Sequence, residues 1–249
     1  MHPIADDRLA LVRDDLVALD GQFDLLRASD ALPFRSVLDI GFGRGGASVY
    51  FASAGKQVTA LSLTEIGVDY PREIADQDYP ADLMDELGIV RSGVDFHDFD
   101  AAPGSFDAIW AAHILEHSLD PGRFLRRSHA LLADDGWLLI SVPPFKHQVV
   151  MGHVCVGWNL GLLMHALVVT GFDVRSGRFV RHGYNIAAFV QKGNPLEPLI
   201  ARGASYDELS VTAFQEPYCE SCWPFRVKQG FEGDLEAINW EWPDGAGPG

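Results

Sequence analysis

The fold of this chain is decided by the stretch Ser36-Val37-Leu38-Asp39-Ile40-Gly41-Phe42-Gly43-Arg44-Gly45-Gly46. Residues 36–40 form a short apolar run that predicts a buried β-strand, and the glycines that follow permit a tight turn with positive φ. Residues 45–54 then return to helical spacing and stop at Gly55. A strand, a glycine-rich turn and a helix in this order predict a ligand site, because the first N–H groups of a helix lack partners within it.

Two details narrow the ligand of this turn. Asp39 stands two residues before Gly41, whereas apolar residues usually precede a loop that binds a pyrophosphate. A carboxylate there favours a positively charged ligand such as a sulfonium or an amino group. Gly41, Gly43 and Gly46 also satisfy the dinucleotide fingerprint, but that reading needs an acid about 20 residues further on. The count reaches Ser62 instead, so an NAD(P)-dependent oxidoreductase is the weaker alternative.

Strands and helices alternate on both sides of the turn. We expect further strands at 57–63, 90–96, 106–111 and 137–142, helices near 80–87, 121–132 and 159–169, and a β pair at 172–181 and 184–191. This alternation predicts a doubly wound α/β sheet of about seven strands with an antiparallel last strand. We divide the chain into an N-terminal helical segment (1–34), a ligand-binding domain (35–193) and a partly loose C-terminal extension (194–249).

Composition excludes several classes of protein. The 249 residues carry 19 basic and 35 acidic side chains, a formal net charge of −16, which argues against binding to nucleic acid or to anionic lipid. Three cysteines do not make a disulfide framework, and the lone Cys219-Glu-Ser-Cys222 lacks two ligands for zinc. The uncharged stretch 147–172 is interrupted by polar residues and glycines, so we predict no membrane span. Without a secretory signal, the chain is expected to be cytoplasmic.

Three segments in register resemble the class I S-adenosylmethionine-dependent methyltransferases. Residues 36–54 resemble the first motif of that superfamily, and residues 105–117 its fourth strand and following loop. Residues 131–143 resemble its helix, turn and fifth strand. The resemblance covers roughly residues 36–192 and implies a Rossmann-like sheet with S-adenosyl-L-methionine as the cofactor.

The resemblance also implies the cofactor-binding residues. Asp39 would hold the methionine amino group, and the backbone of the glycine turn would lie beside it. Ser62 stands where the family usually has an acid for the ribose hydroxyls, which is a departure from its pattern. Asp98 would approach the adenine amino group, with Phe99 as an apolar wall. The complete predicted set is Asp39, Gly41, Phe42, Gly43, Gly45, Ser62, Leu63, Thr64, Asp98, Phe99, Ala111 and His113.

Histidines are the candidate bases. A hydroxyl acceptor must lose a proton, which a histidine with a pKa near neutrality can accept. We predict His117 first and His113 second, both after the fourth strand, and then His153 in the insertion after the fifth. The alternative for His117 is packing and capping of the next helix. Glu116 and the neighbouring histidines and acids could also ligate Mg²⁺, but we predict no metal.

The sequence predicts methyl transfer from S-adenosylmethionine to a hydroxyl of a small molecule or of a glycan. Residues 152–185 look similar to bacterial methyltransferases encoded among surface-polysaccharide genes, which favours a sugar. Three alternatives stay open: an N-methyltransferase acting on a small amine, the NAD(P)-dependent oxidoreductase, and a non-catalytic methyltransferase-like scaffold. The sequence also leaves open whether the protein is a homodimer.

Overall fold

The computed structural model of this protein describes residues 21–63, 81–150, 152–154, 157–193, 223–225 and 231–242. These residues form one sheet with the strand order β3-β2-β1-β4-β5-β7-β6-β8. Its strands are β1 (Ser36–Ile40), β2 (Gln57–Leu61), β3 (Val90–Ser92), β4 (Phe106–Ala112), β5 (Leu132–Val142), β6 (Phe172–His182), β7 (Asn185–Lys192) and β8 (Ala237–Ile238). The helices are α2 (Gln22–Ser29), α3 (Gly46–Ser53), α5 (Ala81–Glu86), α6 (Pro121–Leu131) and α7 (Leu160–Val169), with a 3₁₀ turn η1 (Leu115–His117).

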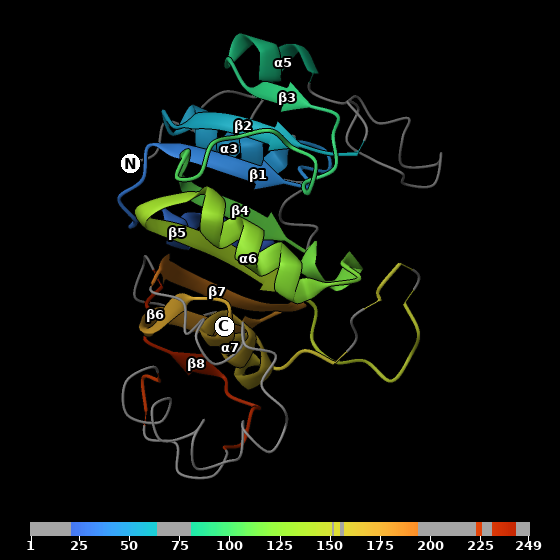
Figure 1. The fold of residues 1–249 in the computed structure, drawn as a ribbon, viewed down its shortest axis with the longest axis vertical. Coiled ribbons are helices and arrows are strands. Elements are labelled where there is room, and N and C mark those ends of the chain that lie inside the picture. Colours follow the sequence, from blue (N-terminus) through green and yellow to red (C-terminus); the bar gives the residue numbers. More distant parts are fainter. Residues whose placement is uncertain are drawn as a thin grey trace.

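The order of the strands reverses between β1 and β4. β1 pairs in parallel with β2 on one side and with β4 on the other, and β4 continues in parallel to β5. In Figure 1 the arrows of these strands point toward one edge, on the right, where the chain between β5 and α7 projects. Open α/β sheets bind ligands at the carboxyl ends of strands beside such a reversal. The predicted doubly wound fold is confirmed, including the antiparallel β7 between β5 and β6.

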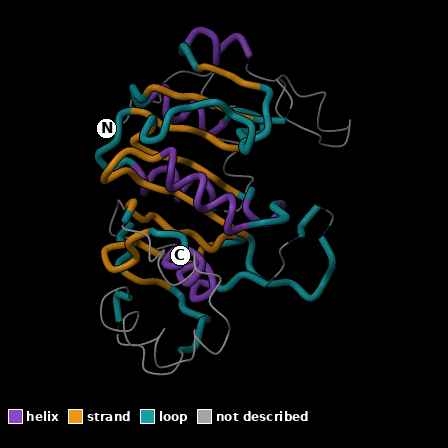
Figure 2. The backbone as a smooth tube through the Cα atoms, viewed as in Figure 1, coloured by secondary structure: helices purple, strands orange, loops and turns teal. Residues whose placement is uncertain are grey.

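Helices cover both faces of the sheet (Figure 2). On one face α6 and α7 bury side chains such as Leu125 and Leu163 against β1, β4 and β5. On the other face α2, α3 and α5 contribute Leu25, Phe51 and Met84. Because both faces are covered, the central strands are almost continuously apolar, as the sequence indicates for β1 and β5.

Three elements differ from the sequence-based expectation. β5 begins at Leu132 rather than 137, since Leu132 already pairs with Phe106 and an irregularity follows before Trp137 pairs with Ala108. β3 has only three residues. The extension adds an eighth strand, because Ile238 pairs antiparallel with Phe179 of β6. A two-residue strand is too short to show an alternating pattern, which explains why the sequence did not reveal it.

The first and the last described segments of the chain pack against this sheet. α2 starts directly after Gly21, which has a left-handed conformation with φ of 91°. Residues 1–20 lie outside the described residues. Trp223 of the extension is buried in the α6/α7 face of the core together with the half-buried Phe225 and Phe231. Cys219 and Cys222 also lie outside the described residues. Among the described helices, none has both the length and the apolar character that crossing a bilayer requires.

Replacing Asp120 with Ala removes the N-cap of α6, because its side chain accepts a hydrogen bond from the Arg123 amide at 2.8 Å. We expect urea denaturation to show a loss of about 1 kcal/mol in the free energy of unfolding. Asp120→Ser keeps a capping oxygen and should stay close to the parent protein. Equal losses in the two variants would contradict the capping role.

Candidate active site

The turn after β1, residues 41–45, is the glycine loop. Gly41, Gly43 and Gly45 all have positive φ, at 71°, 53° and 81°. The amides of Gly41 and Phe42 donate to the carbonyl oxygen of Leu61 at 2.8 and 3.2 Å, which ties the loop to the end of β2. The left-handed conformations explain why glycine is needed at these three positions.

The two sides of the glycine loop differ in how much space they leave for a bound ligand. A Cβ atom on Gly41 would lie 2.0 Å from the Ile114 Cδ1 atom, so Ile114 closes that side. Within the part of the chain that the structure describes, a Cβ on Gly43 would have only the Gly41 carbonyl oxygen within 4.0 Å, so the described residues leave that side open. An open face of glycine backbone beside the N-terminus of α3 has the shape and the donors that a nucleotide-like cofactor requires.

Asp39 lies inside the fold rather than at the mouth of the loop. It is 1% exposed, and its Oδ2 atom accepts a hydrogen bond from the Ser48 hydroxyl at 2.6 Å. Burial raises the pKa of Asp39 to about 7, although the hydroxyl and the backbone amide of Ser48 act in the opposite direction. Asp39 therefore fastens β1 to the first turns of α3 beneath the loop, and its contact with a methionine amino group stays a prediction.

A second cluster follows β4, and we call it the histidine corner: His113, Glu116, His117 and His153. His113 is left-handed, with φ of 56°, and its ring lies 5.7 Å from that of Tyr184. Its Nε2–H donates to the Asn185 Oδ1 atom at 2.9 Å, since the Asn185 amide nitrogen faces a carbonyl oxygen. Its Nδ1 atom lies 3.3 Å from Glu116 Oε1.

The environment of His113 changes its acid–base behaviour. Burial by itself lowers the pKa of His113, but the close contact and negative charge of Glu116, with the Asn185 contact, outweigh it and raise the pKa. Both ring nitrogens thus face protein groups. This arrangement suits a positioning role for His113 more than the role of a base that accepts a proton from a substrate.

His117 and His153 meet at the outer part of the histidine corner. Their ring centroids lie 5.0 Å apart, nearly perpendicular at 84°. The Nδ1–H of His117 donates to the Gly152 carbonyl oxygen at 2.7 Å, so its Nε2 atom is the one that carries a lone pair. Burial lowers the pKa of His153 in spite of the nearby Glu116 charge, which favours the neutral ring.

The remaining predicted residues occupy varied positions. Ser62 directly follows β2 and is half-buried, its amide donates to the Ser92 carbonyl oxygen, and Leu63 is exposed. Thr64 lies outside the described residues, so the ribose ligand stays a prediction. Asp98 is exposed in the segment between β3 and β4, and Phe99 packs against the α6/α7 face. The guanidinium of Arg127 anchors this segment through the Phe99 carbonyl oxygen.

Two other residues predicted to bind the cofactor, Phe42 and Ala111, can contact it only through their backbone atoms. The side chain of Phe42 is buried in the core on the α2/α3 face, and Ala111 is fully buried on the opposite face. Alternate residues of a strand point to opposite faces, so Ala111 packs against helices rather than facing the edge of the sheet.

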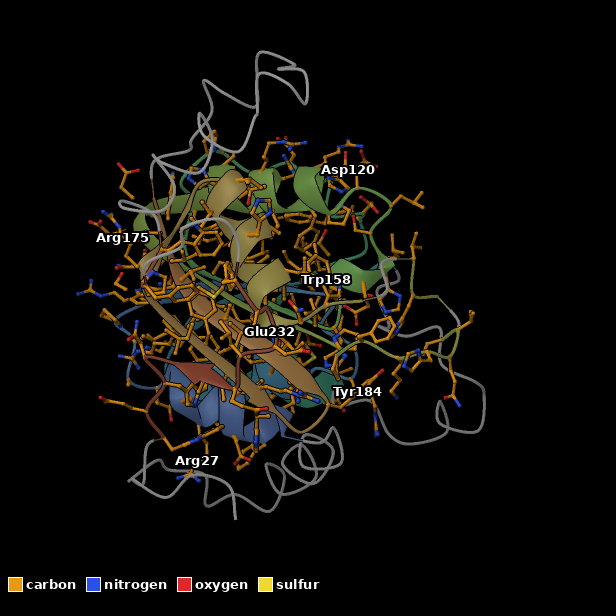
Figure 3. The ribbon with its side chains drawn as sticks, turned by 90° about the horizontal axis from the view of Figure 1, so that it is seen from below. Arg27, Asp120, Trp158, Arg175, Tyr184 and Glu232 are labelled. Atoms are coloured by element: carbon orange, nitrogen blue, oxygen red, sulfur yellow. The ribbon has the colours of Figure 1, made fainter. Side chains whose placement is uncertain are left out.

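The loop between β5 and α7 lies at the same carboxyl edge of the sheet as the glycine loop and the histidine corner. Figure 3 shows Trp158 and Tyr184 on the same side of the molecule, while Arg175 lies at the opposite end. Trp158 accepts a hydrogen bond from the Phe145 amide at 3.1 Å, and Lys146 Nζ lies 4.0 Å above the Tyr184 ring. The loop therefore bends back toward the β6–β7 turn, beside His113.

Sequence reasoning missed Ser48 and Asn185 as parts of these two sites. Asn185 is fully buried and lies 72 positions from His113 along the chain, so no local pattern joins them. Ser48 lies only nine positions from Asp39. A small polar residue on the buried side of the α3 helix is the one signal that points to it.

Comparisons with known proteins agree with this architecture. A family model described as a methyltransferase domain matches residues 19–168, more than half of the chain. The chain is 33% identical over 125 residues to the ubiquinone biosynthesis O-methyltransferase of Xanthomonas campestris pv. campestris, which is 48% of each chain. It is 32% identical over 115 residues to the glycine/sarcosine/dimethylglycine N-methyltransferase of Actinopolyspora halophila, covering 46% of this chain and 20% of that one.

Solved structures show the same fold. The 1,6-didemethyltoxoflavin-N1-methyltransferase of Burkholderia thailandensis, with bound 1,6-didemethyltoxoflavin and S-adenosylhomocysteine, aligns with a TM-score of 0.55. The two chains are 23% identical, and the alignment covers 78% of this chain and 93% of that one. This chain belongs to the methyltransferase-domain family of class I S-adenosylmethionine-dependent methyltransferases. It spans about half the length of the curated O-methyltransferases it matches.

Asp39 makes the stability depend on pH in a direction that can be tested. Its pKa is higher in the folded chain than in the unfolded one, so unfolding releases a proton and Asp39 stabilises the fold less as pH rises. Asp39→Asn lacks this effect. Relative to the parent, its free energy of unfolding should rise by about 2–3 kcal/mol between about pH 5 and about pH 8.

Urea denaturation of both proteins at the two pH values measures this change. Asp100→Asn, at an exposed position, is the matched control. A difference between Asp39→Asn and the parent that does not vary with pH would show that Asp39 is ionised in the folded protein.

Proposed function

We propose that this protein binds S-adenosylmethionine at the glycine loop and transfers its methyl group to a hydroxyl of a small molecule or of a sugar in a glycan. One observation carries the cofactor part of the proposal: the loop at the end of β1 has an open glycine face at Gly43 above the buried Asp39. Family membership supports the same cofactor.

The residues around the loop supply binding and exclusion of water. The cofactor brings a methyl group on a positively charged sulfur, which an in-line attack can remove. The amides of Gly41, Phe42 and Gly45 already donate to carbonyl oxygens of the protein, so we expect the hydrogen bonds to the cofactor to come from Gly43 and from the α3 N-terminus. Ile114 closes one side of the loop. Most of the rate enhancement in such a displacement comes from alignment of the two reactants.

The acceptor is expected at the histidine corner. His117 and His153 lie on the chain that follows β4 and β5, at the carboxyl edge next to the glycine loop. The lone pair on His117 Nε2 suits removal of a hydroxyl proton. The O-methyltransferase of Xanthomonas campestris supports an oxygen acceptor, and the sugar is the narrower part of the proposal.

N-methylation of a small amine is the second candidate. It is favoured by the similarity to an N-methyltransferase of Actinopolyspora halophila. A neutral amine attacks without losing a proton first, so it needs no base. The two candidates therefore differ in how much they depend on His117.

Cofactor binding tests the first step. We expect calorimetric titration to show binding of S-adenosylmethionine and S-adenosylhomocysteine but not of NAD, and Gly43→Ala to weaken it at least tenfold, because its Cβ would enter the open face. Gly55→Ala is the matched control: its φ is 78° and a Cβ there meets no atom of the described residues within 4 Å, but it follows α3, away from the loop. Binding of NAD alone would overturn the proposal.

His117→Ala tests the acceptor. Release of S-adenosylhomocysteine can be followed with a panel of phenols, sugars and primary amines. With a hydroxyl acceptor, kcat should fall by about 10²–10⁴-fold while the affinity for the cofactor is kept. With an amine acceptor above its pKa, kcat should stay near that of the parent, and this result would favour the N-methyltransferase.

A further inference from the structure

Glu116 presents the least satisfied charge in the described residues. Its side chain is fully buried, and neither carboxylate oxygen accepts a hydrogen bond within the part of the chain that the structure describes. The Nδ1 atom of His113 is 3.3 Å away but not in hydrogen-bonding geometry. A buried carboxylate is costly unless a charge or several donors compensate it.

Two imidazole rings converge on the same carboxylate. Glu116, His117 and His153 each offer one ligand atom, and these atoms lie within 4.8 Å of one another. The backbone holds this arrangement, because the Val154 amide donates to the Glu116 carbonyl oxygen at 2.8 Å. His117 donates its Nδ1–H to the Gly152 carbonyl oxygen, as metal-ligating histidines typically do with the nitrogen that does not bind the metal.

We propose that Glu116, His117 and His153 bind one first-row divalent cation, of the Zn²⁺ or Mn²⁺ kind. Two nitrogens and one carboxylate suit these ions, whereas Mg²⁺ and Ca²⁺ prefer sites made of oxygens. Three protein ligands leave coordination positions for water or substrate. This inference departs from the sequence-based expectation of no metal, and it places a cation beside Glu116 in addition to the His113 ring.

The cation deepens the proposed function, on which its catalytic consequence rests. An acceptor hydroxyl bound to it becomes more acidic, as water does on zinc. Its proton then passes to solvent water, the oxygen forms a bond to the methyl carbon, and the carbon–sulfur bond breaks with its electron pair staying on sulfur. His117 Nε2 cannot bind the cation and accept the acceptor proton at the same time, so in this scheme His117 is a ligand in place of the base described above, and His153 is a second ligand.

The competing explanation is an ion pair. If His113 is protonated, its positive charge can compensate the Glu116 carboxylate without any metal. The rings of His117 and His153 then only pack together. The two explanations differ in whether the purified protein binds a cation, and in which residues that binding depends on.

Direct metal titration decides between them. The full-length protein is stripped with a chelator and titrated with MnCl₂, ZnCl₂ and MgCl₂ by calorimetry, and the melting temperature is recorded with each. We expect one equivalent of Mn²⁺ or Zn²⁺ to bind and to raise the melting temperature. Glu116→Gln and His153→Ala should each weaken binding at least tenfold, and Mg²⁺ should bind far less tightly.

His147→Ala is the matched control for His153→Ala, since His147 lies on the same loop but packs against Phe145 outside the cluster. Its metal affinity should equal that of the parent. His153 is only half-buried, whereas Glu116 is fully buried, so the His153 variant keeps the test valid even if Glu116→Gln fails to fold. Absence of binding by both Mn²⁺ and Zn²⁺, or binding unchanged in His153→Ala, would overturn the metal site.

S-adenosylmethionine titration in parallel separates this failure from failure of the proposed function. A protein that binds the cofactor but no cation contradicts only the metal site. A protein that binds the cation but not the cofactor contradicts the proposed function and leaves the metal site standing.

Discussion

The hydrogen bond between the Ser48 hydroxyl and the buried Asp39 carboxyl group holds the centre of this molecule together. It joins β1, the strand at which the sheet order reverses, to the helix that follows the glycine loop. The loop between them must take three left-handed conformations, which only glycine accepts at small cost. The position of the loop is thus set by a buried polar contact on one side and by the Leu61 carbonyl oxygen on the other.

The histidine corner is built differently. The glycine loop comes from one short stretch of sequence, whereas the side chains of this corner follow β4 and β5, and Asn185 at the start of β7 contacts His113. It is held by contacts between the backbone and side chains, such as those of Gly152 with His117 and of Val154 with Glu116. Such a corner can change its side chains without changing the sheet, which suits a family with varied acceptors.

This difference explains what the sequence could predict. The strand–loop–helix unit around Gly41 and the later strands were predictable because each is a local pattern of apolar residues and glycines. The histidines were predictable as candidates, since their residue type and their position after strands 4 and 5 were visible. Other features depend on tertiary contacts that leave no periodic signal in the sequence. They are the hydrogen bond between His113 and Asn185, the lack of hydrogen bonds to Glu116 among the described residues, and the strand at residues 237–238.

The two buried carboxyl groups have separate tasks in this scheme. Asp39 lies one residue before the end of β1 and Glu116 follows the neighbouring strand β4, so both carboxyl groups lie near the same edge of the sheet. Asp39 is held by Ser48, and burial raises its pKa to about 7, so near neutral pH it adds less negative charge to the cofactor side than an exposed carboxylate would. Glu116 has no such donors and keeps its need for a cation. A sulfonium and a divalent cation repel each other, so a site that uses both needs its stronger negative charge beside the metal, where the structure has Glu116.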